Sequence, residues 1–220
     1  MACTIDSLYD DYLNIQTQWE EEDEGNKGTD DHNYEVTSYF FLERLFKAFP
    51  FSEDDHIVDF GCGKGRVLFM AAHNSCRYIS GIENHKGRYE ILKTNIDKHQ
   101  QKHGKEAEFN VHNIDARSAP IDSKANKFFF FEPFSLDIFK LLMQNIIQSI
   151  KDSPRDASIF LYLPHAETLD FFDSLKIFKK EIYVNSSLFY LDDELVSMPQ
   201  FAIYSNFSMA DLVNPEFLLY

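Results

Sequence analysis

The chain has 220 residues, with 36 acidic and 21 basic side chains and a formal net charge of −15 at pH 7. This length suits a single domain, and a hydrophobic content of 44% with 22 phenylalanines excludes a wholly disordered chain despite the charge. The acidic excess also argues against a protein that grips nucleic acid by bulk electrostatics, because such proteins neutralise phosphates with lysine and arginine.

The charge is unevenly distributed along the chain. Residues 1–60 carry 16 acidic and 3 basic side chains, whereas residues 61–130 carry 7 acidic and 12 basic ones. The three cysteines form neither a CxxC pair nor a disulfide framework, which indicates a reducing environment. The first residues lack the apolar segment of a signal peptide, and no apolar run is long enough for a membrane helix. We therefore expect a cytoplasmic protein that makes no contact with a membrane.

Residues 1–33 are predicted to form an acidic N-terminal extension ahead of a single domain over residues 34–220. Residues 1–19 have a partial apolar helical face, and five consecutive acidic side chains at 20–24 lead into a stretch with Gly and Asn. Such a pattern is typical of a helix followed by a solvated, mobile loop. A lid or a docking arm is the alternative.

From residue 34 onward, helical and strand patterns alternate along the chain. Apolar spacing predicts a helix over 38–49, which Pro50 ends. The expected strands are 56–60, 78–82, 106–111, 128–131, 158–163, 177–184, 187–191 and 201–206, and the expected later helices are 64–73, 85–103, 135–150 and 167–175. This order predicts an α/β fold, a doubly wound and mostly parallel sheet with helices on both faces and antiparallel strands at the C-terminal end.

The most informative segment is 57–68, in which an apolar strand ends in Asp59 and leads through a glycine-rich loop into a helix. Gly61, Gly63 and Gly65 stand at every second position, where they permit a sharp turn and the close approach of a ligand. In open α/β sheets, ligands bind beyond the C-terminal strand ends, at the switch in strand order. A dinucleotide-binding GxGxxG pattern would need a glycine at position 66, where this chain has arginine.

This pattern, an acid followed by GxGxG, resembles motif I of the class I S-adenosylmethionine-dependent methyltransferases. The resemblance implies a Rossmann-like sheet of about seven strands with an antiparallel C-terminal strand pair, and S-adenosyl-L-methionine as the cofactor. Asp59 suits the ammonium of the cofactor's methionyl end. The methionyl chain is expected to lie over the loop of Gly61, Cys62, Gly63 and Gly65, in which Cys62 fills space, since no base that could activate the thiol is identifiable.

Two further segments match the family in order. Glu83 ends the second predicted strand, 22 residues after Gly61, and the equivalent acid of the family holds both ribose hydroxyls. Asp115 and Ala116 follow the third predicted strand, where the family contacts the adenine amine and a ring nitrogen. An Asx turn is the alternative explanation for Asp115.

A fourth segment bears on the methyl acceptor. Glu132, Pro133 and Phe134 follow the apolar strand 128–131 and resemble, imperfectly, the (D/N)PP(Y/F) motif of amino-group methyltransferases. In that motif a polar side chain and a carbonyl orient the amine for in-line transfer, so placement supplies much of the rate, and a carboxylate could also accept a proton. Because Glu replaces Asp or Asn and one proline is absent, the alternative is that Glu132 only ends a strand or contacts the cofactor.

Tyr34, Thr37 and Ser38 precede the first helix of the predicted domain. The resemblance makes them candidates for contacts to the cofactor carboxylate, and a simple helix cap is the alternative. His73 and Cys76 form a lone HxxC pair, which provides too few ligands for zinc, so we expect no metal site.

These features predict a methyltransferase that uses S-adenosylmethionine and an unidentified acceptor, with nitrogen on a small molecule or a protein side chain as the first choice. One alternative is an RNA methyltransferase, which the charge disfavours. Another is a non-catalytic partner or regulatory subunit that retains the cofactor, which the imperfect fourth motif leaves open. A nicotinamide-linked oxidoreductase would need the missing third glycine.

Overall fold

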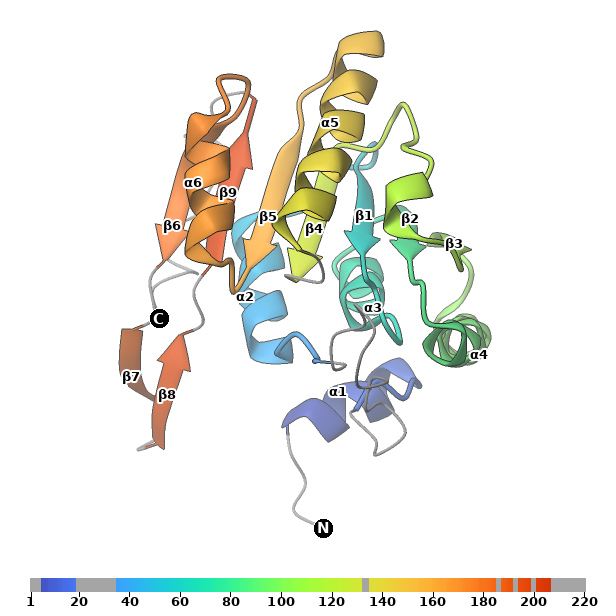
Figure 1. Ribbon diagram of the computed structural model, residues 1–220. Helices are drawn as coiled ribbons and strands as arrows, with labels where there is room; N and C mark the ends of the chain where they lie inside the picture. The colour runs from blue at the N-terminus through green and yellow to red at the C-terminus, as the bar shows by residue number, and fades with distance from the viewer. Residues whose placement is uncertain are drawn as a thin grey trace.

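The computed structural model describes residues 5–18, 35–131, 135–184, 187–191, 194–198 and 201–206. Its centre is a seven-stranded sheet with the order β3-β2-β1-β4-β5-β9-β6 (Figure 1). The strands are β1 (His56–Phe60), β2 (Tyr78–Ile82), β3 (Glu108–His112), β4 (Lys127–Phe131), β5 (Ser158–Tyr162), β6 (Lys179–Val184) and β9 (Phe201–Ser205). Strands β1 to β5 are parallel, and β9 runs antiparallel to both β5 and β6. The predicted doubly wound sheet with antiparallel C-terminal strands is confirmed.

The strand order reverses between β1 and β4, since the chain places β2 and β3 on one side of β1 and then β4 and β5 on the other. Open α/β sheets bind ligands at such a reversal, beyond the C-terminal ends of the strands. Strand β1 pairs with β2 in a register that ends with Phe60 opposite Ile82. The residues that follow these two strands therefore emerge side by side.

Helices cover both faces of the sheet, with α2 (Tyr39–Ala48), α3 (Arg66–His73) and α4 (Lys86–His103) in one apolar cluster and α5 (Leu136–Asp152) and α6 (Ala166–Ser174) in the other. Figure 1 shows α5 and α6 in front of the sheet and α2 and α3 behind it. Ile57 of β1 joins the first cluster and Val58 the second, as expected of a strand buried on both faces. Within the described ranges, no helix combines the length and the apolar character needed to cross a membrane.

Two strands lie outside the main sheet. β7 (Ser187–Leu191) and β8 (Glu194–Met198) pair with each other as an antiparallel hairpin that interrupts the chain between β6 and β9. The sequence predicts a strand at 187–191 but not β8, because the letters ELVSM show no clear alternation of apolar and polar residues. Nor does the sequence predict that β7 and β8 pair with each other outside the main sheet.

The N-terminal helix α1 (Ile5–Leu13) ends earlier than the predicted 1–19. Asn14 takes a left-handed φ of 58°, a conformation in which asparagine often ends a helix. Residues 15–17 continue in a non-helical conformation, and Leu13 and Ile15 are buried in the cluster of α2 and α3. The described part of the acidic extension is thus packed against the rest of the chain.

Candidate functional site at the ends of strands β1 and β2

The glycine-rich loop folds back over the end of β2. The backbone amides of Gly61 and Cys62 donate to the carbonyl of Ile82 at 2.8 and 3.0 Å, and the amide of Gly65 donates to Cys62 at 2.8 Å. Gly63 and Gly65 take φ values of 54° and 97°, which side chains rarely adopt. The positive φ values therefore explain why glycine stands at positions 63 and 65 of this turn.

Glu83 is almost fully buried and joins the loop to the start of α4. One carboxylate oxygen, Oε2, accepts from the amide of Gly63 at 2.8 Å, and Oε1 accepts from the amide of His85 at 2.6 Å. Burial raises the pKa of Glu83, although the amides of His85 and Gly63 counteract it. Each oxygen has a further lone pair, so the carboxylate can accept from two ligand hydroxyls without leaving the loop.

Asp59, at the end of β1, is also buried, with 3% of its surface exposed. Among the residues described in the structure, none donates a hydrogen bond to its carboxyl group or forms an ion pair with it. Burial, and then the neighbouring charge of Glu83, raises the pKa of Asp59 well above its ordinary value. A buried carboxyl group without a partner is costly, and a cationic ligand would relieve that cost.

Cys62 lies in the glycine loop near these two acids and is buried. Burial raises the pKa of its thiol well above the usual value, and the charges of Asp59 and Glu83 add to the effect. A thiol held in its neutral form is a poor nucleophile. This agrees with the space-filling role expected for Cys62.

Asp115 and Ala116 lie just beyond β3, at the start of the short 3-10 helix η2 (Ala116–Ser118). The Asp115 side chain accepts from the amide of Arg117 at 2.8 Å and pairs with its guanidinium, which lowers the pKa of Asp115. The Asx-type turn considered for Asp115 is therefore present. Nearby, the side chain of Asn113 donates to the carbonyls of Glu83 and Asn84 at 2.8 and 2.9 Å, which fixes this loop beside the end of β2.

Of the three upstream candidates, Thr37 is buried, and its carbonyl accepts from Nη1 of Arg66 at 3.1 Å. Ser38 occupies the position before α2, but its side chain makes no capping hydrogen bond. Ser38 is therefore the N-cap residue, as considered, but its hydroxyl does not cap the helix. Tyr34, like Glu132, Pro133 and Phe134, lies outside the described residues. In the described ranges, no group of three or more His, Cys, Asp or Glu side chains could hold a metal ion.

Two buried cations, Lys64 and Arg66, were missed by the sequence reasoning. Nζ of Lys64 donates to the carbonyl of Gln18 at 2.9 Å. The Arg66 guanidinium donates from Nε to the Thr17 hydroxyl at 2.9 Å and lies 4.2 Å over the ring of Tyr39. One signal could have found them, since two cations stand at the beginning of an otherwise apolar helix, where the helix dipole disfavours positive charge.

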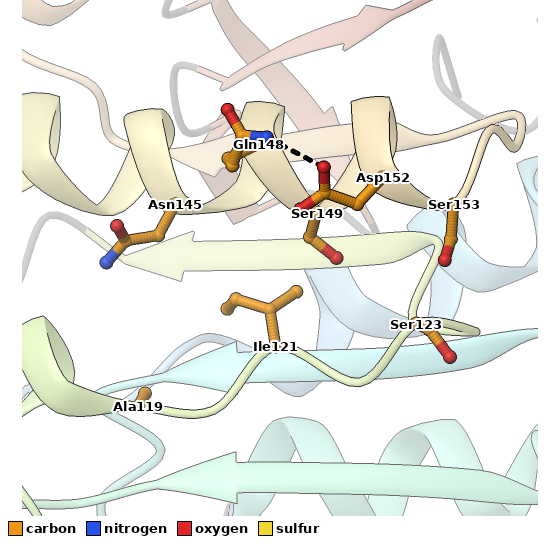
Figure 2. A pocket seen from close by; sticks show the side chains of 8 residues that line it. All are labelled: Ala119, Ile121, Ser123, Asn145, Gln148, Ser149, Asp152 and Ser153. Atoms are coloured by element: carbon orange, nitrogen blue, oxygen red, sulfur yellow. Dashed lines mark hydrogen bonds between the residues drawn. The ribbon is translucent and has the colours of Figure 1, made fainter.

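A separate depression of about 390 Å³ lies away from the glycine loop. Figure 2 shows it between the chain after η2, represented by Ile121 and Ser123, and the last turns of α5, represented by Ser149 and Asp152. Both segments lead into strands, β4 and β5 respectively, so the depression is at the opposite end of the parallel strands from the loop. None of the predicted site residues lines it.

No family model matches the sequence, and no curated protein is similar to it at sequence level. Solved structures are similar in fold. A proposed RNA methyltransferase from Pyrococcus horikoshii has a TM-score of 0.56 at 13% identity, over 93% of this chain and 98% of that one. An RNA methyltransferase from Salinibacter ruber, in complex with S-adenosyl-L-homocysteine, has a TM-score of 0.53 at 13% identity, over 77% and 92%.

A third similar structure is an S-adenosylmethionine-dependent O-methyltransferase from Thermotoga maritima. It has a TM-score of 0.51 at 13% identity, over 78% of this chain and 66% of that one. At such identities the likeness concerns the fold. The chain has the Rossmann-like fold of the class I methyltransferases, as the resemblance in the glycine loop implied.

Proposed function

We propose that this chain, which has the class I methyltransferase fold, binds S-adenosyl-L-methionine at the ends of β1 and β2 and transfers its methyl group to an acceptor nitrogen. The observation that carries the proposal is the pair of buried acids at the strand ends. Glu83 is tied to the glycine loop through Gly63, and Asp59 is buried beside it without a partner among the described residues. A turn with a purely structural role would gain nothing from a second buried carboxyl group, because burying it without a partner is costly.

The two acids suit different parts of the cofactor. Glu83 has both oxygens fixed by backbone amides, so it can accept from two neighbouring ribose hydroxyls in a defined direction. Asp59 suits the ammonium of the amino-acid end, directly or through water. When bound, the cofactor supplies a methyl group on a sulfonium that is activated for displacement. The neutral Cys62 thiol near the acids offers no competing nucleophile.

The remaining contacts follow the family resemblance. Asp115 and Ala116 would meet the adenine, and Gly61 and Gly65 would give the methionyl chain room beside the backbone. Thr37, with Ser38 and Tyr34, would face the carboxylate end.

The acceptor would bind beyond β4, which is the neighbour of β1 in the sheet. Phe130 pairs with Phe60, so β4 ends beside the end of β1, from which the glycine loop starts. We propose that Glu132, Pro133 and Phe134, which come next, hold the acceptor nitrogen in line with the methyl group. For such a displacement, positioning contributes much of the rate. A nitrogen on a small molecule or a protein side chain is the first choice.

RNA is the second candidate acceptor, because two structures of similar fold are described as RNA methyltransferases. The net charge of −15 favours the first choice, since RNA-binding proteins use basic surfaces to neutralise phosphates. A non-catalytic subunit that retains the cofactor would bind it and transfer nothing.

Calorimetry with S-adenosylhomocysteine tests the cofactor assignment. Glu83→Gln replaces one acceptor oxygen with an NH₂ group, so we expect the affinity to fall by about 10- to 100-fold, the usual cost of one or two charged hydrogen bonds. The control, Glu90→Gln, changes an exposed glutamate of α4 that pairs with Lys93. The absence of binding heat in the wild type would refute the proposal.

Transfer of radiolabelled methyl groups then separates the acceptors. Purified RNA, protein and small-molecule fractions are offered in parallel with S-adenosylmethionine. Label in the protein or small-molecule fraction supports the first choice, whereas label in RNA supports the second. Cofactor binding without transfer to any fraction would favour the non-catalytic subunit.

A further inference from the structure

The guanidinium of Arg66 has one buried nitrogen without a hydrogen-bond partner. Only 3% of the residue is exposed. Nε donates to Thr17, and Nη1 donates to Asp6 at 2.9 Å and to the carbonyl of Thr37 at 3.1 Å. Nη2 is buried, and no residue within the described part of the chain accepts a hydrogen bond from it. An unmade hydrogen bond of a buried charged group is expensive, so this donor requires an explanation.

Arg66 stands between the glycine loop and the segment before α2. It follows Gly65 directly as the first residue of α3, and its Nη1 reaches the backbone of Thr37. Positive charge at a helix N-terminus is unfavourable, because the helix dipole is positive there. The arrangement becomes favourable when an anion binds at the same place.

The described part of the N-terminal segment fixes the orientation of the Arg66 guanidinium. The hydroxyl of Thr17 accepts from Nε and donates to Asp10 at 2.7 Å, while the carboxylate of Asp10 also accepts from Tyr39. The Tyr39 ring supports the guanidinium from one face at 4.2 Å. Figure 1 shows α1 beyond the arrowheads of β1 and β2, where residues 14–18 approach the loop. The orientation of Nη2 is thus fixed before any ligand arrives.

We propose that Nη2 of Arg66 binds the carboxylate of the cofactor's amino-acid end, and that residues 5–18 are part of the cofactor site because they fix this arginine. The inference rests on the proposed function and adds a selectivity to it. A ligand with both an ammonium and a carboxylate satisfies Asp59 and Arg66 together. A ligand that lacks the carboxylate leaves the buried Nη2 without a partner.

The test compares S-adenosylmethionine with decarboxylated S-adenosylmethionine, which lacks only the carboxylate, by calorimetry. The wild type should prefer the intact cofactor by about 10- to 100-fold, as expected for one charged hydrogen bond. Arg66→Lys keeps the charge but removes the planar fork. We expect this variant to lose more affinity for the intact cofactor than for the decarboxylated ligand, so that most of the preference disappears. Arg44→Lys, on α2 over the ring of Phe40, is the matched control and should keep the preference.

Asp6→Asn provides a second variant that leaves Arg66 and the core intact, since Asp6 is partly exposed. Because Asp6 helps to fix the guanidinium through Nη1, its loss should lower the preference for the intact cofactor at least about twofold. If Arg66→Lys lowered the affinity for both ligands equally, Arg66 would have a purely structural role and the inference would be overturned. So would a wild type that binds both ligands equally, or a preference unchanged by Asp6→Asn. A wild type that binds neither ligand would instead refute the proposed function.

Discussion

The carboxylate of Glu83 accepts a hydrogen bond of 2.8 Å from the amide of Gly63, which ties the end of β2 to the loop that follows β1. Its other oxygen accepts from His85, at the start of α4. One carboxylate thus fixes three segments of the chain. Because it is buried, its charge also raises the pKa of the neighbouring Asp59. Burial of Asp59 and the charge of Glu83 together therefore make the second acid costly to keep charged.

Asp59→Asn should stabilise the ligand-free protein and weaken its binding of S-adenosylhomocysteine. Burial raises the pKa of Asp59 in the folded state, so its favourable contribution is present below the unfolded value of 3.8 and is lost as the pH rises through the folded value. At pH 7 the neutral amide avoids this loss, and we expect a gain of about 0.5–2 kcal/mol in the free energy of unfolding. Urea denaturation measures the gain, which should shrink near the unfolded pKa.

Asp55→Asn is the matched control at the other end of β1. Although burial raises the pKa of Asp55, the Lys127 ammonium and hydrogen bonds from Ser52 and Asn126 outweigh it and lower the pKa. Its stabilising contribution is therefore present above the unfolded value of 3.8, and the amide should cost about 1–3 kcal/mol at pH 7. Stabilisation by Asp55→Asn, or destabilisation by Asp59→Asn, would contradict this account of the two acids.

The parts of the fold and site that the sequence could predict are those encoded by local patterns. The apolar run 128–131 and the spacing of glycines after Asp59 are each contained in a few residues. Strand β1 is buried on both faces and reads as an apolar run, which distinguishes it from an exposed strand. Glu83 was found because the βαβ unit fixes how far along the chain the second strand must end.

The contacts of the N-terminal segment could not be predicted in this way. Asn95 of α4 hydrogen-bonds Gln16, which is 79 residues away in the chain, and Thr17 meets Arg66 across 49 residues. Local periodicity in the sequence cannot predict contacts between residues so far apart in the chain. The buried face of α4 includes polar residues beside Leu92 for the same reason, since Asn95 and His99 also hydrogen-bond the backbone of the N-terminal segment. From the sequence alone, polar residues on such a helix are interpreted as a solvent-exposed face.

Asn95→Leu should loosen the N-terminal segment. The side chain of Asn95 is buried, donates to the carbonyls of Gln16 and Lys64 at 2.9 and 3.0 Å, and accepts from the amide of Gln16 at 3.0 Å. Losing these bonds should cost about 1–3 kcal/mol. Hydrogen exchange measures the effect directly, because the Gln16 amide loses its acceptor and should exchange faster.

Thr94→Ala is the control for this variant, since Thr94 is the preceding residue of α4 and its hydroxyl bonds only within the exposed helix surface. It should change neither the free energy of unfolding nor the exchange of Gln16 noticeably. Unchanged exchange at Gln16 in Asn95→Leu would show that the segment is held by other contacts.

The stability of the protein should fall as the pH drops below the ordinary histidine pKa. Burial lowers the pKa of His99, whose Nδ1 hydrogen-bonds the carbonyl of Leu13, and nearby His103, His73 and Lys102 lower it further. A lowered pKa means that the unfolded chain binds more protons, so stability is lost as the pH falls through the unfolded value of 6.5. Urea denaturation between about pH 7.5 and 5.5 should show the decline.

His99→Asn should reduce this pH dependence, because the amide can still donate to Leu13 but does not titrate. His56 and His73 also have lowered pKa values owing to burial, so part of the decline should persist in the variant. A pH dependence that is identical in wild type and His99→Asn would exclude His99 as a contributor.

Gly65→Ala should disturb both stability and the glycine loop. Gly65 has a φ of 97°, and an added Cβ would come within 2.5 Å of Cδ1 of Leu92 and 2.9 Å of Cε2 of Phe69. The strained backbone costs about 1–2 kcal/mol, and the overpacking adds about 1–3 kcal/mol. Leu92 and Phe69 are both buried and have little room to move, so we expect the loop to take part of the shift and the affinity for S-adenosylhomocysteine to fall.

Gly104→Ala tests backbone strain without overpacking. Gly104 follows α4 with φ 88° and ψ −176°, a region more restricted to glycine than the φ 97° and ψ 16° of Gly65, and an added Cβ would meet nothing within 4 Å. This variant should therefore show the backbone strain alone, about 1–3 kcal/mol, with unchanged ligand affinity. Urea denaturation and calorimetry on both variants provide the comparison. If Gly65→Ala bound the ligand as the wild type does, contact between the loop and α4 would have no part in shaping the site.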